Sequence, residues 1–228
     1  MSHFTVYVFS NQYGNNVEDL LAPYDESLEM APYVRYTREQ AIAKVRKEIE
    51  DYKHGLYAEF LADPEAYKEK VKKTAFDEER YNAHIDYLEN EFPKKLEWTD
   101  DECYEEEAYW FREDGMIDDD GNLLSTYNPN SKWDWYSTGG RWKDALITKD
   151  GKGTNEDYIS QIDWTKTSMP FAFITPNGEW HERGEMGWWA CVSNEKNGDD
   201  WEDEYRSTVY KMLKEDGDIM VTVVDCHI

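Results

Sequence analysis

The two ends of the chain constrain the fold most, because each carries an alternating pattern of apolar side chains. Near the start, residues 3–9 place Phe4, Val6 and Val8 on one face and two aromatic side chains on the other. Residues 219–228 alternate in the same way. A two-residue period is typical of a β-strand that is buried on at least one side. Both ends of the chain are therefore predicted to be strands of a sheet.

The last third of the chain supplies further elements. Residues 171–175 predict a strand, a Pro-Asn-Gly turn follows, and residues 180–192 predict one or two returning strands. Residues 199–214 predict a helix because their apolar side chains fall on one face. An earlier helix is expected over residues 38–54. The elements then follow the order strand, helix, strand, strand, helix, strand.

This order predicts an α+β fold. It is the order of a ferredoxin-like split βαβ unit, here expected as an antiparallel sheet with helices on one face. In that arrangement the first and last strands are antiparallel neighbours. We therefore expect His3 to lie beside Asp225 and His227.

A long helical stretch interrupts this pattern. Capping-box signals at Thr37 and Thr99 precede apolar residues at helical spacing, and the faces expected to be exposed are acidic. We therefore predict one core domain, formed by residues 1–36 and 114–228, that carries a large acidic helical insertion at residues 37–113.

The net charge excludes several classes of partner. The chain has 50 Asp and Glu residues against 25 Lys and Arg residues, a formal net charge of −25. This charge repels phosphate backbones and anionic membranes, so neither direct nucleic-acid binding nor membrane binding is expected. Solubility is the simplest role for such a charge. A surface that mimics a nucleic acid is the sharper alternative.

Cysteine use and hydropathy indicate a compartment. The three cysteines fit no disulfide framework or metal-ligand spacing, which suits a reducing cytosol. The N-terminus lacks the pattern of a secretory signal, and nowhere do eighteen apolar residues run together. We therefore expect a soluble protein of the cytoplasm.

The segment at residues 128–142 has the composition of a binding site. Its tryptophans and tyrosine offer flat apolar faces, and Arg141 offers a planar fork of donors for an anion. Gly139 and Gly140 allow the backbone to approach a ligand closely. A core hairpin with an ion pair between Asp134 and Arg141 would account for the segment equally well. His181 and Glu185 are expected to lie near this segment. The candidate ligand-binding residues are therefore Lys132, Asp134, Trp135, Tyr136, Gly139, Gly140, Arg141, His181 and Glu185.

Histidines at the expected strand ends allow a second interpretation. Imidazole and carboxylate groups together bind divalent metals or form acid–base pairs. The spacing matches no metal signature, so histidines satisfied by backbone and carboxylate partners are the simpler interpretation, and no cofactor is expected. The alternative is a divalent metal ion held by His3, His181, Asp225 and His227.

Short motifs are spread over both ends and the middle of the chain. They are MSHFTV at 1–6, LAPYDE at 21–26, KWDWY at 132–136, GGRW at 139–142, GEWH at 178–181, GEMGW at 184–188 and DCHI at 225–228. Together these motifs resemble a family of bacteriophage and prophage proteins, most of which have no assigned function. The helical stretch at 37–113 has no matching motif. The resemblance implies a phage-encoded protein that acts in the host cytoplasm, and it assigns a role to no residue.

These observations predict an accessory or counter-defence protein that performs no chemistry. Its expected partner is a host bacterial protein or a small signal molecule such as a nucleotide, whose base would suit Trp and Tyr faces and whose phosphates would meet Arg141 and Lys132. A protein target would instead meet the acidic insertion. The alternatives are a small metal-dependent phosphodiesterase or other hydrolase that uses the His/Asp cluster, and an acidic nucleic-acid mimic.

Overall fold

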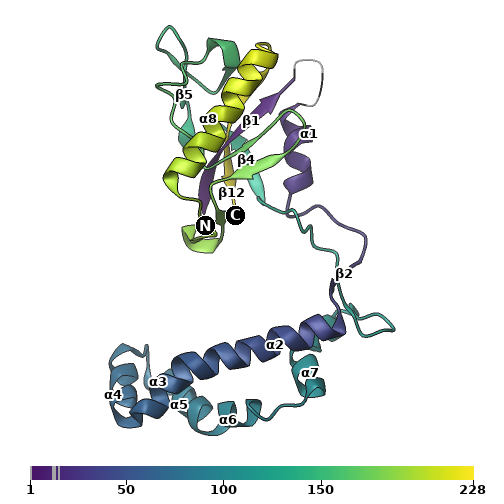
Figure 1. Ribbon diagram of the computed structural model, residues 1–228, viewed down its shortest axis with the longest axis vertical. Helices are drawn as coiled ribbons and strands as arrows, with labels where there is room; N and C mark the ends of the chain where they lie inside the picture. Colours follow the sequence, from purple (N-terminus) through teal and green to yellow (C-terminus); the bar gives the residue numbers. More distant parts are fainter. Residues whose placement is uncertain (1, 12–13, 15) are drawn as a thin grey trace. The chain divides into compact units, whose positions relative to one another are not determined.

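The computed structural model describes residues 2–11, 14 and 16–228. The chain divides into two compact units, named the sheet unit and the helical unit (Figure 1): Met1–Met30 with Tyr127–Ile228, and Ala31–Thr126. Within the described residues, no helix is both long and apolar enough to cross a membrane.

The helical unit is larger than the insertion predicted at 37–113, because it includes a two-stranded ribbon. Strand β2 (Tyr33–Tyr36) pairs with β3 (Leu123–Ser125) where the chain enters and leaves the unit. Residues 31–36 and 114–126 therefore cluster with the helices, whereas the sequence assigns them to the core domain.

The helical unit is built from helices of unequal length. They are α2 (Arg38–Tyr52), α3 (Ala58–Ala62), α4 (Pro64–Thr74), α5 (Glu78–Asp86), α6 (Phe92–Lys95) and α7 (Asp100–Glu113). π-Helical turns at Lys53–Tyr57 and Tyr87–Glu91 join some of them. Both predicted capping boxes are confirmed: Thr37 and Thr99 each accept a hydrogen bond from the backbone three residues on. Such caps satisfy backbone donors that the first helical turn leaves unpaired.

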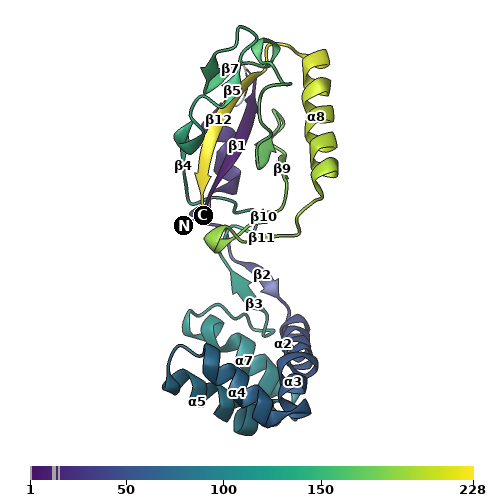
Figure 2. The same ribbon diagram turned by 90° about the vertical axis from the view of Figure 1, so that its left-hand side faces the viewer.

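The sheet unit surrounds one mixed sheet (Figures 1 and 2). Among the described residues its strands are β1 (His3–Ser10), β4 (Trp135–Thr138), β7 (Glu156–Tyr158), β8 (Ala172–Ile174), β9 (Trp180–Glu182) and β12 (Met220–His227). Their spatial order is β4-β12-β1-β8-β9, and β7 also pairs with β12. β1 and β12 run antiparallel, with His3 opposite His227. The predicted pairing of the first and last strands is therefore confirmed.

The α+β class is confirmed, but the strand order differs from that of a split βαβ unit. In a split unit the third strand lies between the first two. Here β8 lies directly beside β1 and parallel to it, and β9 pairs antiparallel with the outer edge of β8. The turn between β8 and β9 is tight, with Gly178 at φ +85° and its N–H donating to the carbonyl oxygen of Thr175 at 2.8 Å. Because β1 already occupies one edge of β8, the chain returns along the free edge.

The helices of the sheet unit cover both faces of the sheet, whereas the sequence predicts helices on one face. Helix α8 (Gly198–Glu215) buries its apolar side against the face that carries Tyr7 and Phe9 (Figure 2). Helix α1 (Val17–Leu21) packs on the opposite face, against Val6. Successive side chains of a strand point to opposite faces, and both faces of β1 are apolar. Both faces therefore need cover from water.

Shorter elements complete the sheet unit. They are 3₁₀ turns at Ala22–Tyr24, Gly140–Trp142, Ile159–Gln161 and Trp188–Ala190, the strand pair β5 (Leu146–Ile147) with β6 (Gly153–Thr154), and the pair β10 (Glu185–Met186) with β11 (Val192–Ser193).

Candidate functional site

Three adjacent strands bring histidine, aspartate and tryptophan side chains together at one end of the sheet. β12 is the middle strand, and its His227 lies opposite His3 of β1 on one side and Trp135 of β4 on the other. Asp225 lies two residues earlier on β12, and Asp134 immediately precedes β4. We name these five residues the terminal histidine cluster. The expectation that His3 lies beside Asp225 and His227 is confirmed.

Each histidine of the cluster is held by one aspartate. His3 Nδ1 lies 2.8 Å from Asp225 Oδ1, and His227 Nδ1 lies 2.7 Å from Asp134 Oδ1. An ionised carboxylate only accepts hydrogen bonds, so each Nδ1 carries the proton that it donates. Each Nε2 is then an acceptor in the neutral ring and a donor in the imidazolium. Each aspartate therefore orients one imidazole through its Nδ1.

The rings of the cluster pack on one another. The His227 ring stacks on Trp135, with centroids 5.0 Å apart and planes 17° apart, and it forms a T-shaped contact with the His3 ring at a centroid separation of 5.0 Å. Trp135 remains 45% exposed, whereas His227 is 5% exposed. The Nε2 atom of His227 is buried without a hydrogen-bond partner among the described residues. A buried polar atom without a partner is unfavourable, so this nitrogen is the unsatisfied group of the cluster.

The two glycines of the aromatic segment serve to build this cluster. The backbone N–H of Arg141 donates to Asp225 Oδ2 at 2.9 Å. A Cβ at Gly140 would fall well inside van der Waals contact with the Asp225 side chain, and one at Gly139 would lie 2.7 Å from Asn155 Oδ1. Both glycines also have positive φ, +73° and +49° in chain order. Gly140 thus lets the backbone approach Asp225, and Gly139 lets it approach Asn155, so both glycines have a structural role.

Other residues of the predicted site lie elsewhere. Lys132 Nζ binds Glu182 Oε1 at 2.6 Å, and Tyr136 packs edge-on against Trp133 on the opposite face of the sheet. Glu185 lies in β10, exposed, with the Ser193 hydroxyl 3.3 Å from its carboxylate. The predicted single site is therefore divided: Tyr136 points to the face opposite Trp135, its neighbour on β4, and Glu185 belongs to a separate strand pair.

The predicted ion pair between Asp134 and Arg141 is not formed. Asp134 binds His227 instead. The side chain of Arg141 is exposed and forms no ion pair with any residue that the structure describes. Its guanidinium group is therefore available to an anion.

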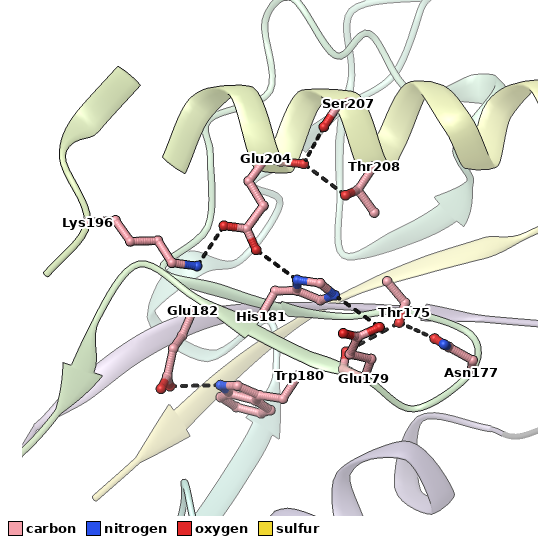
Figure 3. Close-up of polar contacts among 10 residues, drawn as sticks. All are labelled: Thr175, Asn177, Glu179, Trp180, His181, Glu182, Lys196, Glu204, Ser207 and Thr208. Carbon is pink, nitrogen blue, oxygen red and sulfur yellow. Dashed lines mark hydrogen bonds and ion pairs between the residues drawn. The ribbon is translucent and has the colours of Figure 1, made fainter. Parts of the chain in front are cut away.

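His181 belongs to a separate polar network on β9 and α8 (Figure 3). Its Nδ1 lies 2.8 Å from Glu204 Oε1, and Lys196 Nζ binds the other oxygen of Glu204 at 2.6 Å. Its Nε2 faces Glu179 at 3.7 Å. The ring also stacks on Phe173, with centroids 4.5 Å apart and planes 6° apart. His181 is thus oriented by two carboxylates and one aromatic ring, away from the terminal histidine cluster.

A cavity of about 530 Å³ opens beside His181. Polar side chains from the turn between β8 and β9 and from the second half of α8 line it, among them Thr175, Asn177, Glu179, Thr208 and Lys211. Its volume is in the range of small-molecule sites. Its lining combines both charges with hydroxyl and amide groups and favours no one ligand class.

The Glu204 carboxylate gives this network a dependence on pH. Burial acts to raise the pKa of Glu204, but the hydrogen bonds from Lys196 and His181 outweigh it, so the pKa lies below its usual value of 4.5. A depressed carboxyl pKa stabilises the folded state above the unfolded pKa, and this contribution is lost as pH falls through the folded pKa.

We therefore expect the free energy of unfolding of the wild-type protein to fall more steeply than that of Glu204→Gln from about pH 5 to about pH 3. Urea denaturation at a series of pH values measures this difference. Lys196→Met, which removes one of the two donors, should give an intermediate slope. Equal slopes in the wild-type protein and Glu204→Gln would contradict the assignment.

The predicted metal set is not assembled. His181 on β9 lies opposite Phe173 on β8, and Phe173 lies opposite Tyr7 on β1. Tyr7 is four residues along β1 from His3, so His181 lies away from His3. Among the residues that the structure describes, no group of three His, Cys, Asp or Glu side chains is arranged to hold a metal ion. The arrangement instead consists of separate histidine–carboxylate pairs.

The sequence interpretation missed two residues of these sites. Glu204 lies on the predicted helix at 199–214, and its role required knowing that this helix covers the face of β9 that carries His181. Asn155 fixes the glycine turn by accepting the backbone N–H of Asp144 at 2.6 Å, and no sequence motif marks it.

Comparison with protein-family models, curated proteins and solved structures gives no match.

Proposed function

We propose that this chain is a ligand-binding protein without catalytic activity, and that the terminal histidine cluster is its site. The observation that carries the proposal is the buried Nε2 of His227, which has no partner among the described residues. Binding sites commonly place a few unsatisfied polar groups beside apolar or aromatic surface. Here the half-exposed ring of Trp135 provides that surface.

The ligand that fits these groups is small, flat and anionic, such as a nucleotide. A planar base would stack on the exposed part of Trp135. An anionic group would accept hydrogen bonds from the guanidinium of Arg141, which forms no ion pair with the described residues, and from an imidazole Nε2 that carries a proton. Lys132 is omitted from this role because it is bound to Glu182.

The biological setting is part of the same proposal. The sequence motifs that resemble phage proteins suit an accessory or counter-defence role in a bacterial host. A protein that withholds a nucleotide signal from the host needs a binding site and no chemistry. The net charge of −25 favours a small anion held in a local site over a long nucleic acid, whose repeated phosphates the surface repels.

A pair of variants at His227 tests the site. His227→Asn keeps a donor near the Nδ1 position, where it can still bind Asp134, and removes Nε2. His227→Gln places its polar group nearer the Nε2 position. Using AMP, GMP, CMP and UMP as probes, we expect His227→Asn to weaken binding by about tenfold to a hundredfold, and His227→Gln to retain more of it. Isothermal titration calorimetry measures both.

The control is His54→Asn, at an exposed histidine of the helical unit, which should bind as the wild type does. Denaturing protein purified from infected cells and identifying the small molecules released extends the search beyond these four probes. The proposal fails if the wild-type protein binds none of the nucleotides and releases no small molecule. It also fails if His227→Asn binds as tightly as the wild type.

One observation favours a second candidate function, acid–base hydrolysis of a phosphodiester. Two neighbouring imidazoles, each oriented through Nδ1 by an aspartate, have the arrangement in which one ring accepts a proton and the other donates one. Turnover of bis(p-nitrophenyl) phosphate that is lost in both His3→Gln and His227→Gln would support this function. Absence of turnover with retained nucleotide binding would support the first.

A further inference from the structure

The helical unit contains a pocket with the chemistry of a cation site. It lies between α2, α6 and α7, has a volume of about 150 Å³, and is separate from the function proposed for the sheet unit. Four aromatic rings and two carboxylates face it. They are Tyr52, Tyr87, Phe92, Trp98, Glu48 and Glu106, and we name this site the aromatic pocket.

The rings of the aromatic pocket are held in place by one another. The Tyr52 ring lies 4.6 Å from that of Phe92 and 5.7 Å, edge-on, from that of Tyr87, measured between centroids. Phe92 is 1% exposed and anchors the group. Aromatic faces carry partial negative charge and attract cations, most strongly when the site is partly desolvated. The rings of Tyr52, Tyr87 and Phe92 therefore support one another at one side of the pocket.

A cation of the chain itself already uses one side of the pocket. Lys95 Nζ lies 4.4 Å from the centroid of the Trp98 ring and 2.7 Å from Glu106 Oε1. One ammonium group thus meets both an aromatic face and a carboxylate here. Glu48 has a weaker partner, with its Oε1 3.9 Å from Lys44 Nζ. The pocket has two carboxylates against the single charge of Lys95 within its lining.

From these contacts we infer that the aromatic pocket binds a methylated ammonium group, such as the head group of choline. The volume suits a small group such as trimethylammonium, since it is below the roughly 300 Å³ at which sites for drug-sized ligands begin. Such a group forms no hydrogen bonds, and aromatic faces with nearby carboxylates are the environment that recognises it. Lys95 competes with this ligand for Trp98 and Glu106.

The test compares choline with its neutral carbon isostere, 3,3-dimethylbutan-1-ol, on the full chain at constant ionic strength. We expect choline to bind about tenfold more tightly, because the two have the same shape and differ in charge. Calorimetry measures affinity, and the indole N–H signal of Trp98 in NMR spectra reports the location. Equal affinity for the two compounds, or no binding of either, would overturn the inference.

Substitution of the competing lysine gives a stricter test. Lys95→Ala should tighten choline binding by about fivefold, because it frees both the ring of Trp98 and the carboxylate of Glu106. Lys94→Ala is the matched control, since Lys94 is the neighbouring residue and binds Glu91 outside the pocket. Glu106→Gln keeps the shape of the pocket and should weaken binding by a similar factor. Unchanged affinity in Lys95→Ala would contradict the inference, whatever the result for Glu106→Gln.

Discussion

Replacement of Gly140 by alanine is expected to destabilise the sheet unit by about 3 kcal/mol. The new Cβ would collide with the side chain of Asp225, whose carboxylate is buried and already bound by His3 and by the backbone of Arg141. Overpacking of this kind costs about 1–3 kcal/mol, and a non-glycine residue at φ +49° adds about 1 kcal/mol of backbone strain. Urea denaturation followed by tryptophan fluorescence measures the loss.

The control for this prediction is Gly151→Ala. Gly151 also has a positive φ, +83°, but nothing lies within 4 Å of the Cβ that alanine would add. This variant should therefore show only the backbone strain, about 1 kcal/mol. Equal stability of the two variants would contradict the close contact between Gly140 and Asp225. The same result would remove the structural reason for a glycine pair in the aromatic segment.

Phe173→Ala is expected to cost about 3–5 kcal/mol, the range for removing a large buried aromatic side chain. Phe173 is fully buried on β8 beneath α8. The centroid of its ring lies 5.5 Å from that of Trp201. The ring of His181 stacks on it with a centroid separation of 4.5 Å. The substitution therefore leaves a cavity in the core and removes the support of His181. Thermal or urea unfolding monitored by far-UV circular dichroism checks the loss.

Phe76→Ala provides the comparison. Phe76 is 86% exposed in the helical unit, so its removal should change stability by less than about 0.5 kcal/mol. Phe173→Leu should lose less stability than Phe173→Ala because leucine fills most of the space that the phenylalanine side chain occupies. A small effect of Phe173→Ala, comparable with that of Phe76→Ala, would mean that β8 is not a central strand.

Local patterns were sufficient to predict the two longest strands and to locate the three longest helices among the described residues. Alternation along residues 3–9 and 219–228 predicted β1 and β12, and the apolar face of residues 199–214 predicted α8 within one residue at each end. Capping boxes located the start of α2 and α7. These signals depend on residues three or four apart, or on alternate residues, so they can be recognised without a tertiary structure.

These local patterns did not predict the strand order or which helix covers each face of the sheet. The alternation of β1 shows that both of its faces are apolar, but it does not say which helix packs on which face. The placement of β8 next to β1 depends on which strand edges are free when the chain returns. The prediction of helices on one face failed because the short helix α1 covers the second face, and a local pattern does not show which face a helix covers.

For the candidate site, the sequence alone determined which side chains have suitable chemistry and, through the pairing of the first and last strands, that His3 meets Asp225 and His227. Only the tertiary structure decided that Asp134 binds His227, 93 residues away, and that Glu204 binds His181. It also separated Lys132, Tyr136, His181 and Glu185 from the cluster. Residue type and period are local properties of a chain. Hydrogen-bond partners between distant segments depend on strand register and on the side to which each strand directs its side chains, and folding of the whole unit sets both.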